Sequence, residues 1–147
     1  MERTPQHLVL NVFVAMAQES VNDVTAARYA RVHRQLLRFL DEADFALCLG
    51  TGVAMLLEAE RELGGPGAFF RLLGFDELVC CLPEFVAESW LLPGRPDASS
   101  QIDLSERLMR WLRLHGYLDM GLSGCILWDA EEAMARARRR AETPDLP

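Results

Sequence analysis

The sequence predicts a mostly α fold, a single-domain helical bundle of six to seven helices. Apolar residues recur every three or four positions in several segments, which is the spacing of one helix face. Glycine, proline or a polar capping residue separates most of these segments. The chain has 147 residues, half of them apolar and a quarter charged, which is typical of one ordinary globular domain. We place the domain at residues 1–141 and a loose C-terminal tail at 142–147.

Two long helical patterns occupy the N-terminal part of the chain. Thr4 and Pro5 form a good helix start, and the apolar run over 8–16 predicts a well-buried first helix. The next pattern predicts an amphipathic helix with an apolar face and a basic stripe. The face comprises Tyr29, Val32, Leu36 and Leu40, and the stripe comprises Arg28, Arg31, Arg34 and Arg38. We interpret the stripe as a solvated surface paired with local carboxylates such as Asp41 and Glu42.

Shorter helices are predicted in the middle of the chain. Residues 44–49 are a short apolar piece of uncertain type, closed by the glycines at 50–52. The following helical face comprises Val53, Leu56, Leu57 and Leu63. Gly-Gly-Pro at 64–66 ends that helix, because glycine favours the helix terminus and proline cannot continue it. A new helix then begins at the proline and is expected to stop or kink at Gly74.

The segment 78–92 is apolar but interrupted. It contains Pro83, which removes a backbone donor, so we expect a kink or two shorter helices. Residues 93–100 are rich in proline, glycine and serine and predict a surface loop. Asp103 and Glu106 have the spacing of a capping box, which would open the next helix.

The C-terminal segment has two possible secondary structures. Gly116 is expected to end the preceding helix. Residues 117–120 and 125–128 flank the Gly-Leu-Ser-Gly stretch at 121–124, and the whole segment 117–128 predicts either a small β-hairpin or two short helical turns. Asp129 is expected to cap a last helix that begins with acidic residues and ends with arginines, which suits the helix dipole.

Charge and cysteine content restrict the partners and the compartment. The formal net charge of −7 disfavours binding to nucleic acid or to an anionic membrane surface. No segment approaches the roughly 20 apolar residues of a membrane span. The four cysteines, Cys48, Cys80, Cys81 and Cys125, lack a C-x-x-C motif and lie among apolar neighbours. We interpret them as buried thiols of a reducing, cytoplasmic environment, not as a zinc site or a disulfide framework.

No motif in the sequence predicts catalysis. The histidines His7, His33 and His115 lie in separate helices, and none has a second metal ligand three or four positions away. The stretch 121–124 is a near miss to the nucleophile motif G-x-S-x-G, with its second glycine one place early. The stretch 50–52 lacks the lysine of a phosphate loop. We therefore expect a non-enzymatic binding protein with no catalytic residue, metal ligand or cofactor.

Two stretches resemble a known family. The first is Gly65-Pro66-Gly67-Ala68-Phe69-Phe70-Arg71-Leu72-Leu73-Gly74, in which a glycine-containing turn leads into an Ala-Phe-Phe run. It resembles the first homology region of the Bcl family of apoptosis regulators. About 44 residues later, Trp111-Leu112-Arg113-Leu114-His115-Gly116-Tyr117 resembles that family's second homology region. Residues 116–128 are similar to adenoviral small early-region members, which points to a short, divergent, virally encoded relative.

The resemblance, which covers about a third of the chain, implies a helical bundle around one buried central helix. It also implies a groove that binds the amphipathic helix of a pro-apoptotic partner. On this basis Leu56, Leu57, Phe69, Phe70 and Leu73 would line or support the groove, and Trp111 with Gly116 would fix its end. The family's arginine after the turn glycine is replaced by Ala68, and Arg71 is the nearest substitute.

The sequence leaves an alternative open. A helix followed by a glycine turn, a hairpin and another helix over 103–141 would be typical of a winged-helix-like regulatory or adaptor domain. This alternative requires an antiparallel hairpin at 117–128. A homodimer is compatible with either hypothesis.

Overall fold

The computed structural model describes the backbone of residues 5–142, and their side chains except those of 120–127 and 142. Over this part of the chain the protein contains eight helices and no strand. The helices are α1 (Gln6–Glu19), α2 (Asp23–Glu42), α3 (Ala46–Leu49), α4 (Thr51–Gly64), α5 (Ala68–Leu72), α6 (Phe75–Phe85), α7 (Arg95–Leu114) and α8 (Met120–Glu142). The mostly α fold is confirmed, and the expected six to seven helices were slightly too few. Glu142 closes α8, and the rest of the expected tail lies outside the described residues.

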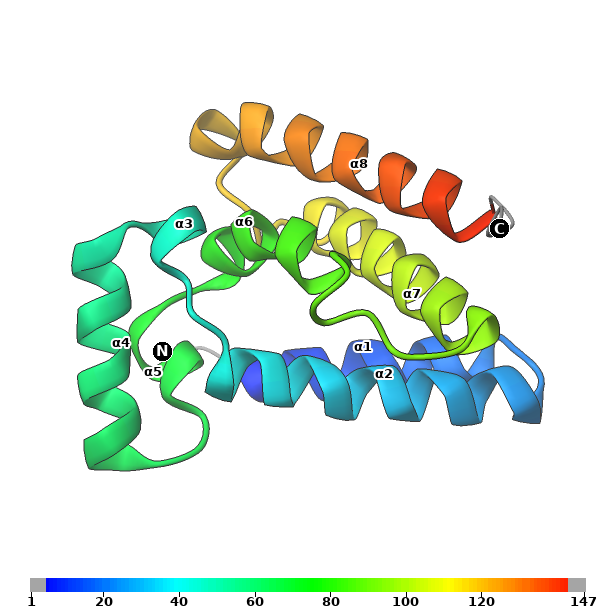
Figure 1. Ribbon diagram of the computed structural model, residues 1–147, viewed down its shortest axis with the longest axis horizontal. Coiled ribbons are helices and arrows are strands. Elements are labelled where there is room, and N and C mark those ends of the chain that lie inside the picture. Colours follow the sequence, from blue (N-terminus) through cyan, green and yellow to red (C-terminus); the bar gives the residue numbers. More distant parts are fainter. Residues whose placement is uncertain (1–4, 143–147) are drawn as a thin grey trace, which may run out of the picture.

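The helices stack in layers with a smaller unit at one end (Figure 1). α1 and α2 form an antiparallel pair, α7 packs across this pair, and α8 packs on α7 and α6. The smaller unit consists of α4 and the short helices α3 and α5. These three helices follow one another in the chain and lie beside the C-terminal end of α2 and the N-terminal end of α1. One contiguous hydrophobic core joins these layers.

The first two helices follow the apolar spacing of their sequences. The buried face of α1 comprises Val9, Leu10, Phe13, Val14 and Ala17. All four apolar residues predicted for the face of α2 are buried, and the Asn22 side chain caps this helix by accepting from the Thr25 N–H at 2.8 Å. The basic stripe pairs partly within its own helix, since Arg38 contacts Glu42 at 2.6 Å.

The centre of the fold is α6, in which no residue is exposed. Its side chains pack against α3, α7 and α8. Pro83 lies inside this helix, which ends two residues later at Phe85. The segment 78–92 is therefore part of one helix followed by turns, and the expected second short helix is absent. A proline this close to the C-terminal end removes one helical hydrogen bond and leaves the earlier turns intact.

The prediction of a surface loop at 93–100 is mostly wrong, because α7 begins at Arg95. Gly94 precedes this helix with a φ of 89°, and Pro96 occupies its first turn. Asp103 and Glu106 consequently lie inside α7 and cap nothing; both carboxylates contact Arg138 of α8 at 2.8 Å. The polar composition of residues 93–100 suggested a loop. In the structure most of this segment is helical, and Asp97 contacts Arg31 of α2 at 2.8 Å.

The β-hairpin considered at 117–128 is also wrong, since α8 begins at Met120 and runs without interruption. Gly116 ends α7 as expected, and its φ of 73° lies in the left-handed region that favours glycine. The Tyr117 N–H donates to the Leu112 carbonyl at 3.0 Å across this turn. Asp129 lies within α8 and caps no helix. The later part of α8 buries Ala130, Ala133, Met134 and Ala137, which share one helix face.

His33 is expected to make stability depend on pH. Its imidazole Nε2 is buried without a hydrogen-bond partner among the described residues, and burial, together with Arg34, lowers its pKa. The folded state then binds fewer protons than the unfolded state, so unfolding becomes easier as pH falls through and below the ordinary histidine pKa. Urea unfolding at pH 7.5 and about pH 5.5 should show a smaller pH effect in His33→Gln than in the wild type.

The matched control for this experiment is His7→Gln, which removes an exposed imidazole. We expect this control to retain the wild-type difference between the two pH values. An unchanged pH effect in His33→Gln would show that other groups cause it.

Candidate functional site

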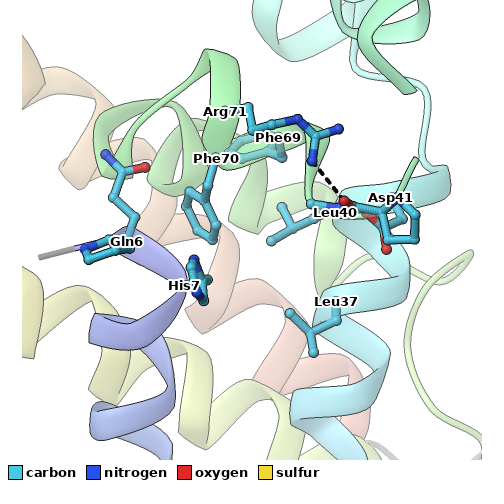
Figure 2. A pocket seen from close by; sticks show the side chains of 11 residues that line it. Gln6, His7, Leu37, Leu40, Asp41, Phe69, Phe70 and Arg71 are labelled. Carbon is cyan, nitrogen blue, oxygen red and sulfur yellow. Dashed lines mark hydrogen bonds between the residues drawn. The ribbon is translucent and has the colours of Figure 1, made fainter. Parts of the chain in front are cut away.

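A hollow of about 690 Å³ lies where the N-terminal end of α1, the C-terminal end of α2 and α5 meet (Figure 2). Its walls are mostly apolar and aromatic, with a few polar groups at the rim. The lining residues are Pro5, Gln6, His7, Leu37, Leu40, Asp41, Pro66, Gly67, Phe69, Phe70 and Arg71. Both the volume and the apolar lining are typical of a binding site.

The turn between α4 and α5 forms one wall of this hollow and is fixed to α2. Gly67 has a φ of 87°, a conformation that L side chains rarely adopt. Its N–H donates to the Asp41 carboxylate at 3.0 Å. α5 then begins with Ala68 and Phe69, both buried. The short α5 is thus held at the end of α2, with Phe70 next in the chain beside the hollow.

Arg71 closes the same turn from the other side. Its guanidinium donates to the Glu60 carboxylate at 2.7 Å, to the Pro66 carbonyl at 2.8 Å and to the Gly65 carbonyl at 3.0 Å. A ligand carboxylate that approached Arg71 would therefore compete with Glu60. In this arrangement the arginine shapes the hollow by holding α4 and α5 together.

Two further hollows are neighbours of the first, as their shared lining residues show. The second, of about 560 Å³, shares Asp41 and Pro66 with the first. The third, of about 400 Å³, shares Glu42 and Arg61 with the second. We call the three together the groove. Its middle is charged, with Arg38, Asp41, Glu42 and Arg61. Its far end includes apolar residues, among them Phe45, Ala54, Met55 and Leu57.

The groove includes only part of the set of site residues that the resemblance implied. Phe69, Phe70 and Arg71 line the first hollow, and Leu57 lines the third. Leu73 is half-buried against the core just after α5. Leu56 is 65% exposed on α4, and Trp111 is half-buried on α7, where it packs against Phe13. Gly116 lies in the turn after α7.

A continuous series of ring contacts nevertheless connects Trp111 to the groove. Neighbouring rings in the series have centroids between 5.1 and 5.6 Å apart, the usual range for aromatic pairs. We call this series the aromatic row. In order it comprises Phe13, Trp111, Tyr117, Phe75, Phe70, Phe69, Phe45 and Phe39, with Phe85 and Trp90 both beside Phe39.

The wall supplied by α1 and α2 was missed by sequence reasoning. Leu37 lies beside the buried face of α2, next to the arginines of the basic stripe, and is 39% exposed. An apolar residue in that position is a sequence signal for a contact surface. No comparable signal marks Gln6 or His7, which reach the groove because α1 begins beside α5.

Arg61 anchors the middle of the groove and is expected to contribute to stability. Its side chain is 13% exposed, donates to the Leu40 carbonyl at 2.9 Å and lies over the Phe45 ring at 5.5 Å. Replacing it with Met should leave that carbonyl without its donor and reduce the free energy of unfolding by about 1–2 kcal/mol. Denaturant unfolding followed by circular dichroism would measure the loss.

Arg113→Met is the control for this substitution, because Arg113 is exposed near the end of α7. Its unfolding midpoint should remain close to that of the wild type. Equal midpoints for Arg61→Met and Arg113→Met would contradict the anchoring role of Arg61.

Among the described residues, no three histidine, cysteine or acidic side chains come together in a way that would suit a metal ion. The described helices also include none with the length and hydropathy needed to cross a bilayer. No protein-family model, curated protein or solved structure matches this chain. The groove is the candidate functional site of the described residues.

Proposed function

We propose that this chain is a non-enzymatic interaction module of the Bcl type, which binds an amphipathic helix of a pro-apoptotic partner in the groove. The observation that carries the proposal is the first hollow, where Phe69, Phe70, Leu37 and Leu40 surround a space of about 690 Å³. An apolar space of this kind accepts the anchor side chains that an amphipathic helix presents every three or four residues.

The surrounding helices support the same proposal. The resemblance implies that a glycine-containing turn leads into a buried central helix that contains the Ala-Phe-Phe run. Here Gly67 precedes the short α5, which contains the run, and the buried helix is the separate α6 that follows, in which every residue is buried or half-buried. The first hollow is lined by residues of α5, which is followed in the chain by the buried helix α6.

The charged middle of the groove would set the register of the ligand. A ligand helix that extends beyond the first hollow meets Arg38, Asp41, Glu42 and Arg61 before the apolar far end. Complementary charges on the ligand would select one orientation more than they would add affinity. A ligand helix with apolar anchor residues at both ends and charged residues between them would suit this lining.

The helical conformation of residues 120–128 counts against the winged-helix alternative. It required a hairpin at 117–128, and residues 120–128 belong to α8. A homodimer, a cytoplasmic location and a viral origin remain predictions of the sequence and of the resemblance. Sedimentation of the purified chain would test the dimer directly.

The proposal is tested by titrating fluorescently labelled helices of pro-apoptotic partners with the full-length protein. Fluorescence anisotropy should rise with a Kd of about 10 µM or tighter for at least one peptide. The same peptide with an anchor leucine changed to glutamate should bind at least about tenfold more weakly. Failure of every peptide in a broad panel to bind at about 50 µM would overturn the proposal.

A further inference from the structure

Two cysteines from separate helices lie in direct contact. The Sγ atoms of Cys48 in α3 and Cys81 in α6 are 3.2 Å apart and share a hydrogen bond. Cys81 is completely buried, whereas Cys48 is half-buried at the edge of the core. A disulfide needs the two sulfur atoms at about 2.05 Å, so they would have to approach by only about 1.1 Å.

The two thiols have different chemical environments. The pKa of Cys48 is lowered, mainly because the Cys81 thiol donates a hydrogen bond to it. The same hydrogen bond and burial raise the pKa of Cys81. Glu84 Oε2 lies 3.6 Å from the Cys48 sulfur and opposes its ionisation in part. Cys48 is therefore the thiol suited to react first, and Cys81 the thiol suited to resolve the product.

We propose that Cys48 and Cys81 form a reversible disulfide when the folded protein meets a peroxide, and that this bond fixes α3 to α6. The Cys48 thiolate attacks one oxygen of hydrogen peroxide, the O–O bond breaks, and the departing hydroxide takes up the proton that Cys48 released, which gives water. The Cys48 sulfenic acid is then attacked by the sulfur of Cys81. The hydroxyl group leaves with the Cys81 proton as a second water, so two thiols and one peroxide give one disulfide and two waters.

The position of the pair gives the bond a structural effect. α3 has only four residues, is joined to α4 through Gly50 alone, and packs against α4 and α6. A bond to α6 would attach this short helix to the most buried helix of the fold. Phe45 and Ala46, at the start of α3, also line the far end of the groove, so the bond would fix that wall.

The test uses the full chain with Cys80 and Cys125 changed to serine, so that only the proposed pair remains. After treatment with one equivalent of hydrogen peroxide, trypsin digestion without reductant should join the peptides 39–61 and 72–107. The joined species should be lighter than the two reduced peptides together by two hydrogen atoms, and dithiothreitol should separate it. The oxidised protein should also unfold at a higher urea concentration than the reduced protein.

A matched variant distinguishes the proposed pair from its neighbour. Cys80 is half-buried beside Cys81 in the sequence, and burial raises the pKa of its thiol. A chain with Cys81→Ala and Cys125→Ser retains Cys48 and Cys80 and should yield no joined peptide. The decisive sample is the folded chain that retains Cys48 and Cys81. If its peptides 39–61 and 72–107 are recovered only as separate species after oxidation, the inference is overturned. This inference does not depend on the proposed function, because its readout requires no ligand.

Discussion

Replacing Gln101 with Leu should reduce the free energy of unfolding by about 2–4 kcal/mol. Gln101 is fully buried in α7, and its amide makes several hydrogen bonds to the chain that follows α6. Its Nε2 donates to the Phe85 carbonyl at 2.8 Å and to the Trp90 carbonyl at 3.1 Å, while its Oε1 accepts from the Leu92 N–H at 2.9 Å. Leucine has a similar size but leaves the Phe85 carbonyl and the Leu92 N–H without this partner, while the Trp90 carbonyl keeps the bond from Gln35. The loss is large compared with the 5–15 kcal/mol that stabilises a typical domain.

Urea unfolding followed by circular dichroism would measure this loss, and Gln35→Leu provides a graded comparison. Gln35 is half-buried and donates to the same Trp90 carbonyl at 2.8 Å, so its replacement removes one of these bonds and should cost about 1 kcal/mol. Equal unfolding midpoints for Gln101→Leu and the wild type would show that these hydrogen bonds do not hold the segment after α6.

Changing Leu37 to glutamate should weaken binding of a helical ligand at least about tenfold while leaving the fold intact. Leu37 lines the first hollow and is 39% exposed, so a polar replacement costs little stability in the free protein. In the complex, a carboxylate there would have to lose its water beside the apolar anchors of the ligand. Fluorescence anisotropy with the tightest peptide of the panel would report the change.

Val24→Glu is the control for the groove variant. Val24 lies in the first turn of the same helix, is 61% exposed and does not line any of the three hollows of the groove. We expect this control to bind like the wild type, and thermal unfolding should confirm that both variants are folded. If Leu37→Glu bound the peptide as tightly as Val24→Glu, the ligand would have to bind outside the first hollow.

Sequence periodicity predicted the fold best where a helix buries one regular face. The apolar residues of α2 repeat at helical spacing, and the structure buries them as predicted. The start of α7 could not be found in this way, because Ser100 and Gln101 look like loop residues in the sequence. They are buried in a helix because Gln101 satisfies backbone groups contributed by another segment. A single-sequence pattern does not contain that information.

Only part of the candidate groove could be predicted, because the rest depends on contacts between distant segments. The Phe69-Phe70 pair is a local motif and could be identified in the sequence. The opposite wall, which includes Leu37 and Gln6, depends on which helix ends meet after folding. Conversely, Leu56 is one residue from the buried Leu57, and a rotation of about 100° per residue is enough to place it in solvent.

The aromatic row should also make the NMR spectrum of the protein sensitive to movements at the groove, through ring-current shifts. Each aromatic ring shifts the resonances of nearby protons, and the shift changes when the ring tilts or moves. A displacement of Phe70 would alter the spectrum of Phe75, whose ring is 5.6 Å away, and through Tyr117 that of Trp111. The indole N–H of Trp111 would therefore report events at the groove from a different helix, without any label attached to the protein.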